Sequence, residues 1–367
     1  MADRKIRIGI IGADANASWA GASHIPALQS QPSFVLAAVA TRREASAKAA
    51  AEAFGAERWF ADPYAMIRDE NIDLVTVAVK VPAHKELVLA ALAAGKAVYC
   101  ESPLGATLAE TEEMAAAATG LHTAIGLQGR HNPALRRAAE LVASGKIGRP
   151  MSARVAATTF GYGPQSPSAY DYFNKAASGA SFLTITTGHV LDVIEKVLGA
   201  ITELDARTEL LWPEIEIVDT GEISRREIPD HVDLIAKTAS GAPVSVQILA
   251  GVPAEEANFT FEIRGSDGWL KITGNHLAGV QVGDLTLSSS AAFAAPDAPV
   301  ATGVGPMAAD FWKGAAINVG EVYASLARDL ASGTHETPGF DHALHNSRLV
   351  AAVERAALTG ERQRNLA

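Results

Sequence analysis

Cysteine is almost absent from this sequence, because Cys100 is the single cysteine among 367 residues. One cysteine cannot form an internal disulfide, and it leaves no set of thiolates for a zinc site. We therefore expect a protein that resides in a reducing compartment and binds no metal.

An excess of basic charge and long apolar runs are also missing. Lys and Arg number 31 against 41 Asp and Glu, a net charge of −10, which excludes a globally positive surface and argues against a direct nucleic-acid partner. No stretch reaches the roughly 20 apolar residues of a membrane span. The first residues, Met1-Ala2-Asp3-Arg4-Lys5, lack the apolar region of a signal peptide. We expect a cytoplasmic protein without membrane contact.

The length of 367 residues suggests two domains, and 48% hydrophobic residues are enough for large cores. Short apolar runs alternate with alanine-rich amphipathic stretches over the first 130 residues. This alternation predicts βαβ crossovers and a parallel sheet covered on both faces, a Rossmann domain. The expected strands are Ile6–Gly12, Val35–Thr41, Leu74–Val79, Ala97–Cys100 and His122–Leu127. The expected helices are Ala22–Gln29, Glu44–Phe54, Pro63–Arg68, His84–Ala94 and Leu108–Ala118.

The pattern changes after the turn Gly145-Lys146-Ile147-Gly148, beyond which extended, alternating segments dominate. They predict an α+β domain with an open, mostly antiparallel sheet, helices on one face, and an early helix at Leu183–Leu198. Residues 288–306 are rich in Ala, Pro, Ser and Gly and read as a surface loop. We expect domains at 1–130 and 131–340, and a C-terminal helix and tail at 341–367 that pack on the first domain. The uncovered sheet face predicts a homodimer or homotetramer.

The first strand ends at Gly12, where a tight turn would bring backbone N–H groups to a pyrophosphate. The spacing G-x-G-x-x-G fails, because Asp14 and Ala17 stand at the second and third glycine positions. The alternative is a structural turn without a ligand. The position favours binding, since the first βα turn of a doubly wound sheet is the usual dinucleotide site.

The second strand is followed by Thr41-Arg42-Arg43 instead of an acidic residue. Arginine matches a ribose 2′-phosphate, so these residues favour NADP, with NAD possible. The alternative is a solvated helix start. The third long strand runs into Lys80, which we place near the nicotinamide or the substrate, against the alternative of a surface lysine. His84 either contributes there or begins the next helix.

The second half contains a dense polar segment from Thr184 to Asp192. His189 and Asp192 are three residues apart and share a helix face, although a lone histidine is often a satisfied core residue. A tyrosine-rich segment, which includes Tyr162 and Tyr172, suits a polyhydroxylated ligand or, alternatively, packs a loop. These residues are the candidates for a substrate site.

Several segments match a known family in register. They are His84…Ala94-Gly95-Lys96-Ala97-Val98…Glu101-x-Pro103-Leu104, Ser144-Gly145-Lys146-Ile147-Gly148 and Ala356-Ala357-Leu358-Thr359-Gly360. The chain resembles the glucose–fructose oxidoreductase/inositol dehydrogenase/rhizopine catabolism (Gfo/Idh/MocA) family over nearly its whole length. Within it, the chain is most similar to the branch that contains the yeast galactose-pathway repressor. That similarity lies in Ser18-Trp19, Val79-Lys80-Val81-Pro82-x-His84, Leu127-Gln128-Gly129-Arg130 and Gly188-His189-x-x-Asp192.

The resemblance implies roles for the residues at these positions. Cofactor-binding residues are expected at Gly12, Ala13, Ser18, Trp19, Thr41, Arg42, Arg43, Lys80, Val81, Pro82, His84, Glu101, Ser102 and Gln128. Substrate-binding residues are expected at Arg130, Tyr162, Tyr172, His189 and Asp192, and catalytic residues at His189 and Lys80. Two positions depart from the family: Ser102 replaces the lysine of Glu-Lys-Pro, and Ile185 replaces the aspartate four residues before the histidine.

These observations predict an NAD(P)-dependent oxidoreductase that acts on a sugar, a cyclitol or a related hydroxyl or carbonyl compound. His189 would act as the acid–base group, and Lys80 or a tyrosine would replace the missing lysine. The alternative is a non-catalytic, dinucleotide-binding regulator similar to the galactose repressor, which has also lost that lysine. Elimination or epimerisation with a retained cofactor is a third possibility.

Overall fold

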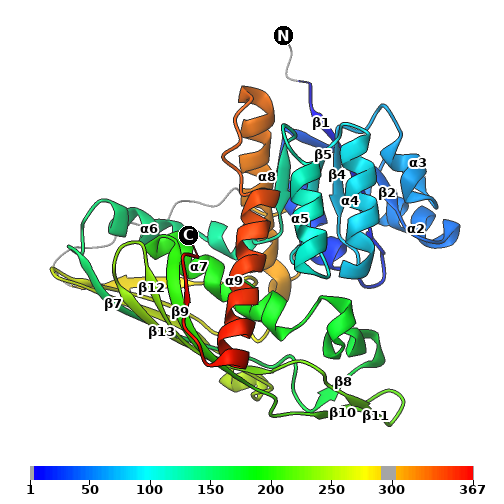
Figure 1. The fold of residues 1–367 in the computed structure, drawn as a ribbon. Helices are drawn as coiled ribbons and strands as arrows, with labels where there is room; N and C mark the ends of the chain where they lie inside the picture. Colours follow the sequence, from blue (N-terminus) through cyan, green and yellow to red (C-terminus); the bar gives the residue numbers. More distant parts are fainter. Residues whose placement is uncertain (1–3, 291–302, 367) are drawn as a thin grey trace. The chain divides into compact units, whose positions relative to one another are not determined.

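The computed structural model describes residues 4–290 and 303–366, which form two compact units (Figure 1). The first unit consists of residues 4–128 and 303–345, and the second of residues 129–290 and 346–366. Residues 303–340, which we expected in the second domain, group with the first unit, and most of the C-terminal helix and tail group with the second. The extent of each independently folding domain stays a prediction.

The first unit contains a six-stranded parallel sheet in the order β3-β2-β1-β4-β5-β6. Its strands are β1 Ile6–Ile11, β2 Phe34–Ala40, β3 Arg58–Phe60, β4 Leu74–Val77, β5 Ala97–Cys100 and β6 Thr123–Ile125. Residues of the central strands are buried almost throughout, as expected where helices cover both faces. The predicted Rossmann architecture is confirmed, although the short strand β3 was not predicted.

Helices cover both faces of this sheet. They are α1 Ile25–Gln29, α2 Glu44–Phe54, α3 Pro63–Ile67, α4 His84–Ala93, α5 Leu108–Ala117 and α8 Lys313–Ser332. One buried cluster joins the sheet to α4 and α5, and another joins it to α1 and α8. Side-chain caps start two of these helices, because Asp62 accepts a hydrogen bond from Tyr64 N and Thr107 accepts one from Glu110 N. The capping residues explain why these helices begin where the sequence indicated.

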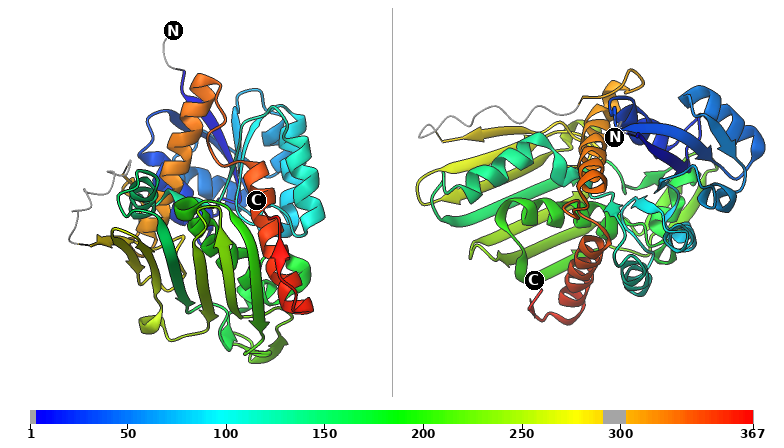
Figure 2. Two further views of the ribbon diagram at one scale, coloured as in Figure 1. Left: turned by 60° about the vertical axis from the view of Figure 1, so that its left-hand side comes forward. Right: turned by 90° about the horizontal axis from the view of Figure 1, so that it is seen from above.

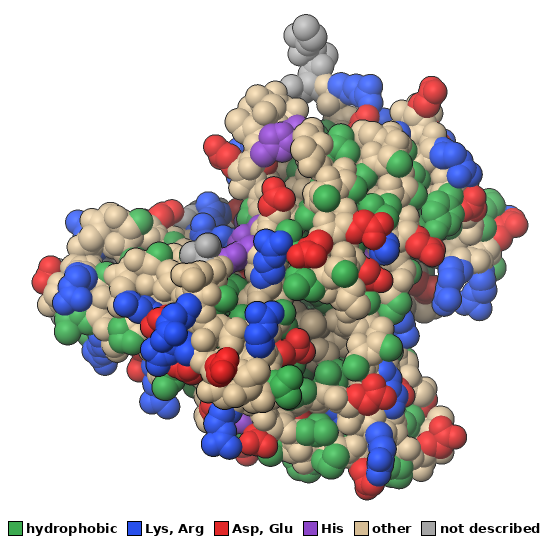
Figure 3. All heavy atoms as spheres, viewed as in Figure 1, with side chains coloured by type: hydrophobic (Ala, Val, Ile, Leu, Met, Phe, Trp, Pro, Cys, Tyr) green, Lys and Arg blue, Asp and Glu red, His purple; other side chains and the backbone are tan. Residues whose placement is uncertain are grey.

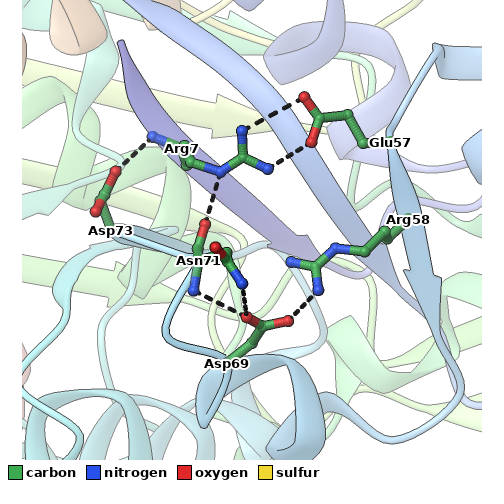
Figure 4. A network of polar contacts seen from close by, with 6 residues as sticks. All are labelled: Arg7, Glu57, Arg58, Asp69, Asn71 and Asp73. Atoms are coloured by element: carbon green, nitrogen blue, oxygen red, sulfur yellow. Dashed lines mark hydrogen bonds and ion pairs between the residues drawn. The ribbon is translucent and has the colours of Figure 1, made fainter. Parts of the chain in front are cut away.

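A polar network ties the strands together at the amino edge of the sheet (Figure 4). Arg7 at the start of β1 donates from its backbone N to Asp73, from Nε to Asn71 O, and from its guanidinium to Glu57. Arg58 pairs with Asp69, and the Arg7 guanidinium lowers the pKa of Glu57. These groups are partly exposed, so solvent weakens each pair and its contribution to stability is modest. The network thus joins the segments that lead into β1, β3 and β4.

The second unit contains an eight-stranded sheet in the order β16-β15-β14-β7-β13-β12-β9-β17 (Figure 2). Only the β7–β13 pair is parallel among the neighbouring strands described, so the expected mostly antiparallel sheet is confirmed. The strands are β7 Pro150–Thr159, β9 Ile201–Glu209, β12 His231–Thr238, β13 Pro243–Ala250, β14 Phe259–Gly265, β15 Trp269–Gly274, β16 Thr286–Ser289 and β17 Gln363–Arg364.

One face of this sheet packs under helices α6 Pro133–Ala143, α7 Gly188–Leu198 and the second half of α9 Phe340–Thr359. The strands alternate accordingly: Val232, Leu234 and Ala236 of β12 are buried, whereas Ile235 is 63% exposed. A small sheet of β8 Gln165–Ser166, β10 Glu214–Ile217 and β11 Glu222–Arg225 was not predicted. The predicted surface loop at 288–306 falls mostly on residues 291–302, outside the described part of the chain.

Acidic and basic side chains are interspersed on the face of the molecule shown in Figure 3. Among the helices of residues 4–290 and 303–366, none is long and apolar enough to cross a bilayer. The described residues also include no cluster of three or more His, Cys, Asp or Glu side chains arranged to hold a metal ion.

Candidate functional site

The first βα turn is built around Gly12, whose φ is +98°. A Cβ on Gly12 would lie 2.3 Å from the carbonyl oxygen of Ala78 and 2.8 Å from Cγ1 of Val79, so a side chain does not fit here. The Gly12 N–H donates to Ala40 O at 2.9 Å. The turn therefore lies directly against the carboxyl ends of both β4 and β2.

The rest of the first loop is held by Ser18 rather than by further glycines. The Ser18 hydroxyl donates to Asp14 O at 2.7 Å and accepts from Asp14 N at 3.1 Å and Gly21 N at 3.0 Å. The loop leads into the π-helix η1 Ala20–His24, a geometry that is rare and concentrated at functional sites. Ser18 thus shapes the loop that was predicted to bind the cofactor, and Asp14 takes the place of a glycine.

Trp19 lies edge-on to Trp312, with ring centroids 5.7 Å apart. Its buried Nε1 has no hydrogen-bond partner among the described residues. Gln128, after β6, is 1% exposed, and its Oε1 likewise accepts no hydrogen bond from that part of the chain. A buried donor and a buried acceptor thus remain for a polar ligand.

Two arginines follow β2, at the same edge of the sheet. Arg42 and Arg43 are exposed, and Thr41 turns its hydroxyl inward to Ser46 at 2.6 Å. Arg43 precedes α2 with an extended backbone, so it adds positive charge at a helix start that already favours anions. The two guanidinium groups are available to an anion, whereas Thr41 is engaged within the loop.

The turn after β4 contains the exposed Lys80, the buried Val81 and the exposed Pro82. His84 begins α4 and is 1% exposed. Its Nε2 lies 2.9 Å from Val79 O, and its Nδ1 lies 3.1 Å from Pro103 O. Burial lowers the pKa of His84. His84 therefore joins the turns after β4 and β5, and any effect on a cofactor would pass through those turns.

Glu101 follows β5, and its carboxylate contacts a buried histidine of the same unit. Its Oε1 lies 2.8 Å from Nε2 of His24, which is fully buried. The Nδ1 of His24 lies 2.8 Å from the hydroxyl of Tyr323, and that hydroxyl lies 2.9 Å from Oγ1 of Thr76. A Cβ on Gly126 would lie 2.7 Å from Oε2 of Glu101. The adjacent Ser102 is partly exposed.

In the second unit, His189 lies in the first turn of α7 and is 4% exposed. Asp192, one turn later, is fully buried and pairs with the Arg130 guanidinium. The start of α7 is anchored by Asn346, whose Nδ2 donates to Gly188 O at 2.9 Å. An ion pair thus joins two of the predicted substrate-binding residues, Asp192 of α7 and Arg130 just before α6, and His189 lies one turn before Asp192 on the same helix.

Tyr162 and Tyr172 belong to an aromatic group with Phe173, whose ring centroid lies 5.7 Å from that of Tyr162 and 4.2 Å from that of Tyr172. Burial, and then the neighbouring Tyr170, raises the pKa of Tyr172 to about 12. The ring of Tyr162 also lies 5.6 Å from that of Phe182. Of the two tyrosines predicted to bind substrate, Tyr162 therefore contacts the segment Phe182–Thr187, which leads into α7.

The sequence did not indicate four residues that hold these groups in place: His24, Tyr323, Arg226 and Asp230. His24 and Tyr323 are 299 positions apart, and such a contact has no local signature. Arg226 and Asp230 form a buried ion pair at spacing i, i+4 outside any helix. Two opposite charges in a loop are usually solvated, so their spacing alone gives no signal of burial.

A parallel sheet with a glycine turn at its carboxyl edge is the arrangement typical of dinucleotide-binding proteins. The model of the oxidoreductase family with an NAD-binding Rossmann fold (Gfo/Idh/MocA) matches residues 6–127, and that of the Gal80p C-terminal domain matches residues 133–274. The chain belongs to the Gfo/Idh/MocA oxidoreductase family, as the resemblance predicted.

Two relatives illustrate the range of functions in this family. Dehydrogenase aclE of Aspergillus oryzae is 32% identical over 290 residues, which cover 75% of this chain and 78% of the relative. The galactose/lactose metabolism regulatory protein GAL80 of Saccharomyces cerevisiae is 29% identical over 320 residues, which cover 81% and 73%. The chain is therefore similar both to an enzyme and to a regulator.

Solved structures with the same fold also include both a regulator and an enzyme. A super-repressor mutant of Gal80p from Saccharomyces cerevisiae matches with a TM-score of 0.86 and 24% identity, over 98% of each chain. Levoglucosan dehydrogenase in complex with NADH and L-sorbose matches with a TM-score of 0.80 and 22% identity, over 99% of each chain. At these identities the matches establish the shared fold.

Replacing Gly12 tests the close approach at the first turn. We expect Gly12→Ala to lower the free energy of unfolding by more than about 2 kcal/mol, since the methyl group would meet a backbone oxygen as well as an unfavourable φ. Gly55→Ala is the matched control, because Gly55 has φ +71° but no atom within 4 Å of its added Cβ. Denaturant unfolding measures both. Equal losses in the two variants would show that the contact with Ala78 is unimportant.

The pH dependence of stability tests the surroundings of Arg130. Burial, and then Arg130, lowers the pKa of the neighbouring His131 to about 3, whereas an unfolded histidine titrates near about 6.5. Unfolding thus takes up a proton between these values, and stability falls as the pH falls. We expect His131→Asn to lose about 1–2 kcal/mol less stability than the wild type between pH 7 and pH 5.

Denaturant unfolding at the two pH values measures this difference. His335→Asn, at an exposed histidine of the first unit, is the control and should follow the wild type. A His131→Asn profile parallel to that of the wild type would contradict the assignment.

Proposed function

We propose that this chain is an NAD(P)-dependent oxidoreductase that acts on a sugar, a cyclitol or a related hydroxyl or carbonyl compound. The observation that carries the proposal is the buried His189 at the start of α7, one turn before an aspartate that Arg130 holds. A neutral imidazole is suited to taking and returning a hydroxyl proton near neutral pH. The similarity to dehydrogenases in sequence and fold supports it.

The carboxyl edge of the first unit fits a dinucleotide. Gly12 lets the chain turn tightly against the end of β4, and such a turn brings backbone N–H groups of the first loop toward a pyrophosphate. Trp19 Nε1 and Gln128 Oε1 offer a donor and an acceptor to the polar parts of the cofactor. Arg42 and Arg43 would pair with a 2′-phosphate, which favours NADP over NAD.

A nicotinamide, when bound, would accept a hydride from the carbinol carbon or return one to a carbonyl carbon. His189 would take the hydroxyl proton as the carbonyl forms and donate it in the reverse direction. Asp192 and Arg130 would hold the helix face that presents the imidazole. Lys80 or Tyr172 would hydrogen-bond the reacting oxygen in place of the lysine that Ser102 replaces.

A second function is favoured by one specific observation, the serine at position 102. Without the lysine of the family, a chain similar to Gal80p would bind a dinucleotide and a small molecule without transferring a hydride. The deciding experiment follows reduced nicotinamide absorbance with NADP or NAD and a panel of sugars, cyclitols and keto-sugars. Turnover supports the oxidoreductase, whereas dinucleotide binding without turnover on any panel member supports the regulator.

The cofactor preference is tested with the double variant Arg42→Ala/Arg43→Ala. Loss of charge-assisted hydrogen bonds of about 1.5–3 kcal/mol should weaken NADP binding by roughly tenfold to a hundredfold, and NAD binding much less. Isothermal titration calorimetry measures both affinities. Arg4→Ala/Arg68→Ala removes the same charge from exposed arginines of the same unit and serves as the control. Equal weakening of NADP and NAD would rule out recognition of the 2′-phosphate.

The role of His189 is tested with His189→Asn and a confirmed substrate. We expect kcat to fall by about two orders of magnitude, with the dinucleotide affinity nearly unchanged because the cofactor residues belong to the other unit. Steady-state kinetics and cofactor titration give the two quantities. His335→Asn again serves as the control, and full activity of His189→Asn would exclude the acid–base role.

A further inference from the structure

A segment from late in the chain runs along the first loop of the parallel-sheet unit. Residues 303–323, which include the start of α8, contact residues 19–31, which contain η1 and α1. For example, Gly305 N donates to Pro26 O at 2.8 Å. Helix α8 itself packs on both η1 and α1, and all of these residues belong to the first unit. The first loop of the candidate cofactor site is thus backed by α8.

The π-helix η1 depends on such support, because it consists of only five residues, Ala20–His24. A helix this short is unstable in water by itself, and π-helical winding is rare outside functional sites. No side chain caps its start with a hydrogen bond, and three of its five residues are buried. The packing against η1 therefore determines how it is wound.

The first contact lies at the start of η1, where Trp19 meets Trp312. Trp312 directly precedes α8, and its ring lies edge-on to that of Trp19, with 5.7 Å between the centroids. Phe311 in turn lies edge-on to Trp312, at 4.6 Å. Edge-on pairs of aromatic rings have a defined geometry, so Trp312 restricts the orientation of the Trp19 indole. It thereby sets the direction of Nε1, the buried donor that has no partner among the described residues.

The second contact lies at the last residue of η1. The ring of His24 lies between Tyr323 of α8 and Glu101 after β5: its Nδ1 is 2.8 Å from the Tyr323 hydroxyl, and its Nε2 is 2.8 Å from Glu101 Oε1. The Tyr323 hydroxyl also lies 2.9 Å from Thr76 Oγ1. Every group is satisfied when Thr76 donates to Tyr323, Tyr323 donates to Nδ1, and a neutral His24 donates to the carboxylate.

The residues at the two contacts include candidates for cofactor binding. The side chain of Glu101 is 13% exposed, so a ligand at the carboxyl edge can reach its carboxylate while Oε1 is held. Trp19 supplies an unused donor in the first loop. Trp312 touches Trp19 directly, and one histidine separates Tyr323 from Glu101. Each link between α8 and a candidate cofactor residue is therefore a direct contact or a pair of hydrogen bonds.

We propose that Trp312 and Tyr323 are positioning residues of the dinucleotide site. Trp312 holds the indole of Trp19, and Tyr323 holds the carboxylate of Glu101 through His24. The inference rests on the proposed binding of a dinucleotide at the carboxyl edge. It adds that α8 strengthens this binding, because groups that are already oriented lose less freedom when a ligand binds.

The first test compares Trp312→Leu with Trp312→Phe in the full-length protein, with NADP and NAD titrated by calorimetry. Leucine keeps the site apolar but removes the ring, whereas phenylalanine restores an edge-on partner. We expect Trp312→Leu to weaken both dinucleotides by about fivefold or more, and Trp312→Phe to stay within about twofold of the wild type. Trp59→Leu, at a more exposed tryptophan on β3 of the same unit, is the matched control and should bind as the wild type does.

A double-variant cycle separates positioning from a general loosening of the unit. Phenylalanine at position 19 has no N–H to direct, so Trp312→Leu added to Trp19→Phe should weaken binding by less than about twofold further. General loosening would weaken binding as much in this background as in the wild type.

Tyr323→Phe is tested in the same way, alone and in Glu101→Ala. Alone it should weaken both dinucleotides by about threefold or more, and in Glu101→Ala it should have little further effect. Tyr64→Phe is its control, because the Tyr64 hydroxyl bonds to Glu86 elsewhere in the same unit. If Tyr323→Phe fails to fold, the Trp312 variants alone decide.

A further readout needs no dinucleotide. The chain has five tryptophans, so the indole N–H signals of nitrogen-15-labelled protein are few, and that of Trp19 is assigned by its loss in Trp19→Phe. We expect its hydrogen exchange to be faster by about tenfold or more in Trp312→Leu and close to the wild type in Trp312→Phe.

Unchanged dinucleotide affinity in both Trp312→Leu and Tyr323→Phe would overturn the proposal, as would equal weakening by Trp312→Leu with and without Trp19. An effect of only one variant keeps that residue and rejects the other. If the wild type binds neither dinucleotide, the proposed cofactor site falls and the exchange rate decides. Faster exchange in Trp312→Leu would then support the positioning of Trp19, and unchanged exchange would reject it as well.

Discussion

The close packing of Gly12 against the carbonyl of Ala78 fixes the path of the chain at the carboxyl edge of the parallel sheet. Strands β1 and β4 lie side by side at the centre of the order β3-β2-β1-β4-β5-β6, and the chain leaves β1 through a gap that admits no side chain. The loop that follows is held by hydrogen bonds of the Ser18 hydroxyl to Asp14 and Gly21. The π-helix η1 comes next. That helix ends at His24, whose ring reaches Glu101 beyond β5. One steric constraint thus connects the first turn to the turn after β5.

The same chain of contacts explains why residues 303–345 group with the first unit. Tyr323 of α8 is fully buried, hydrogen-bonds His24 and Thr76, and packs edge-on against Tyr99. A helix from late in the sequence therefore supplies part of the interior of the Rossmann unit. The domain boundaries expected from the sequence followed the change of pattern near residue 145. The return of residues 303–345 to the first unit could not be predicted in this way, because local composition does not show which unit a late helix packs on.

Much of the fold follows from periodicity. Helix α2 was predicted at its observed bounds, Glu44–Phe54, and strand β5 at Ala97–Cys100, because long apolar patterns and turn residues delimit them. The short strands β3, β8, β10, β11, β16 and β17 were missed, since they contain no continuous apolar run like that of Ala97–Cys100. The candidates Gly12, His189, Asp192 and Arg130 came from position and resemblance, and the structure joins two of them in the ion pair of Arg130 and Asp192. The π-helix η1 and the charge pair of Arg226 and Asp230 depend on distant contacts that no local pattern encodes.

The last described residues lie along the outer edge of the large sheet. Gln363 and Arg364 pair with Leu204 and Glu203 of β9, and Leu366 N donates to Thr202 O at 3.3 Å. An unpaired edge strand is a template onto which another molecule can add its own strand. Here the tail covers only Thr202–Leu204 of β9, which are thereby closed to another strand. Displacement of the tail from β9 would leave these backbone N–H and C=O groups unpaired, and another strand could then pair with them.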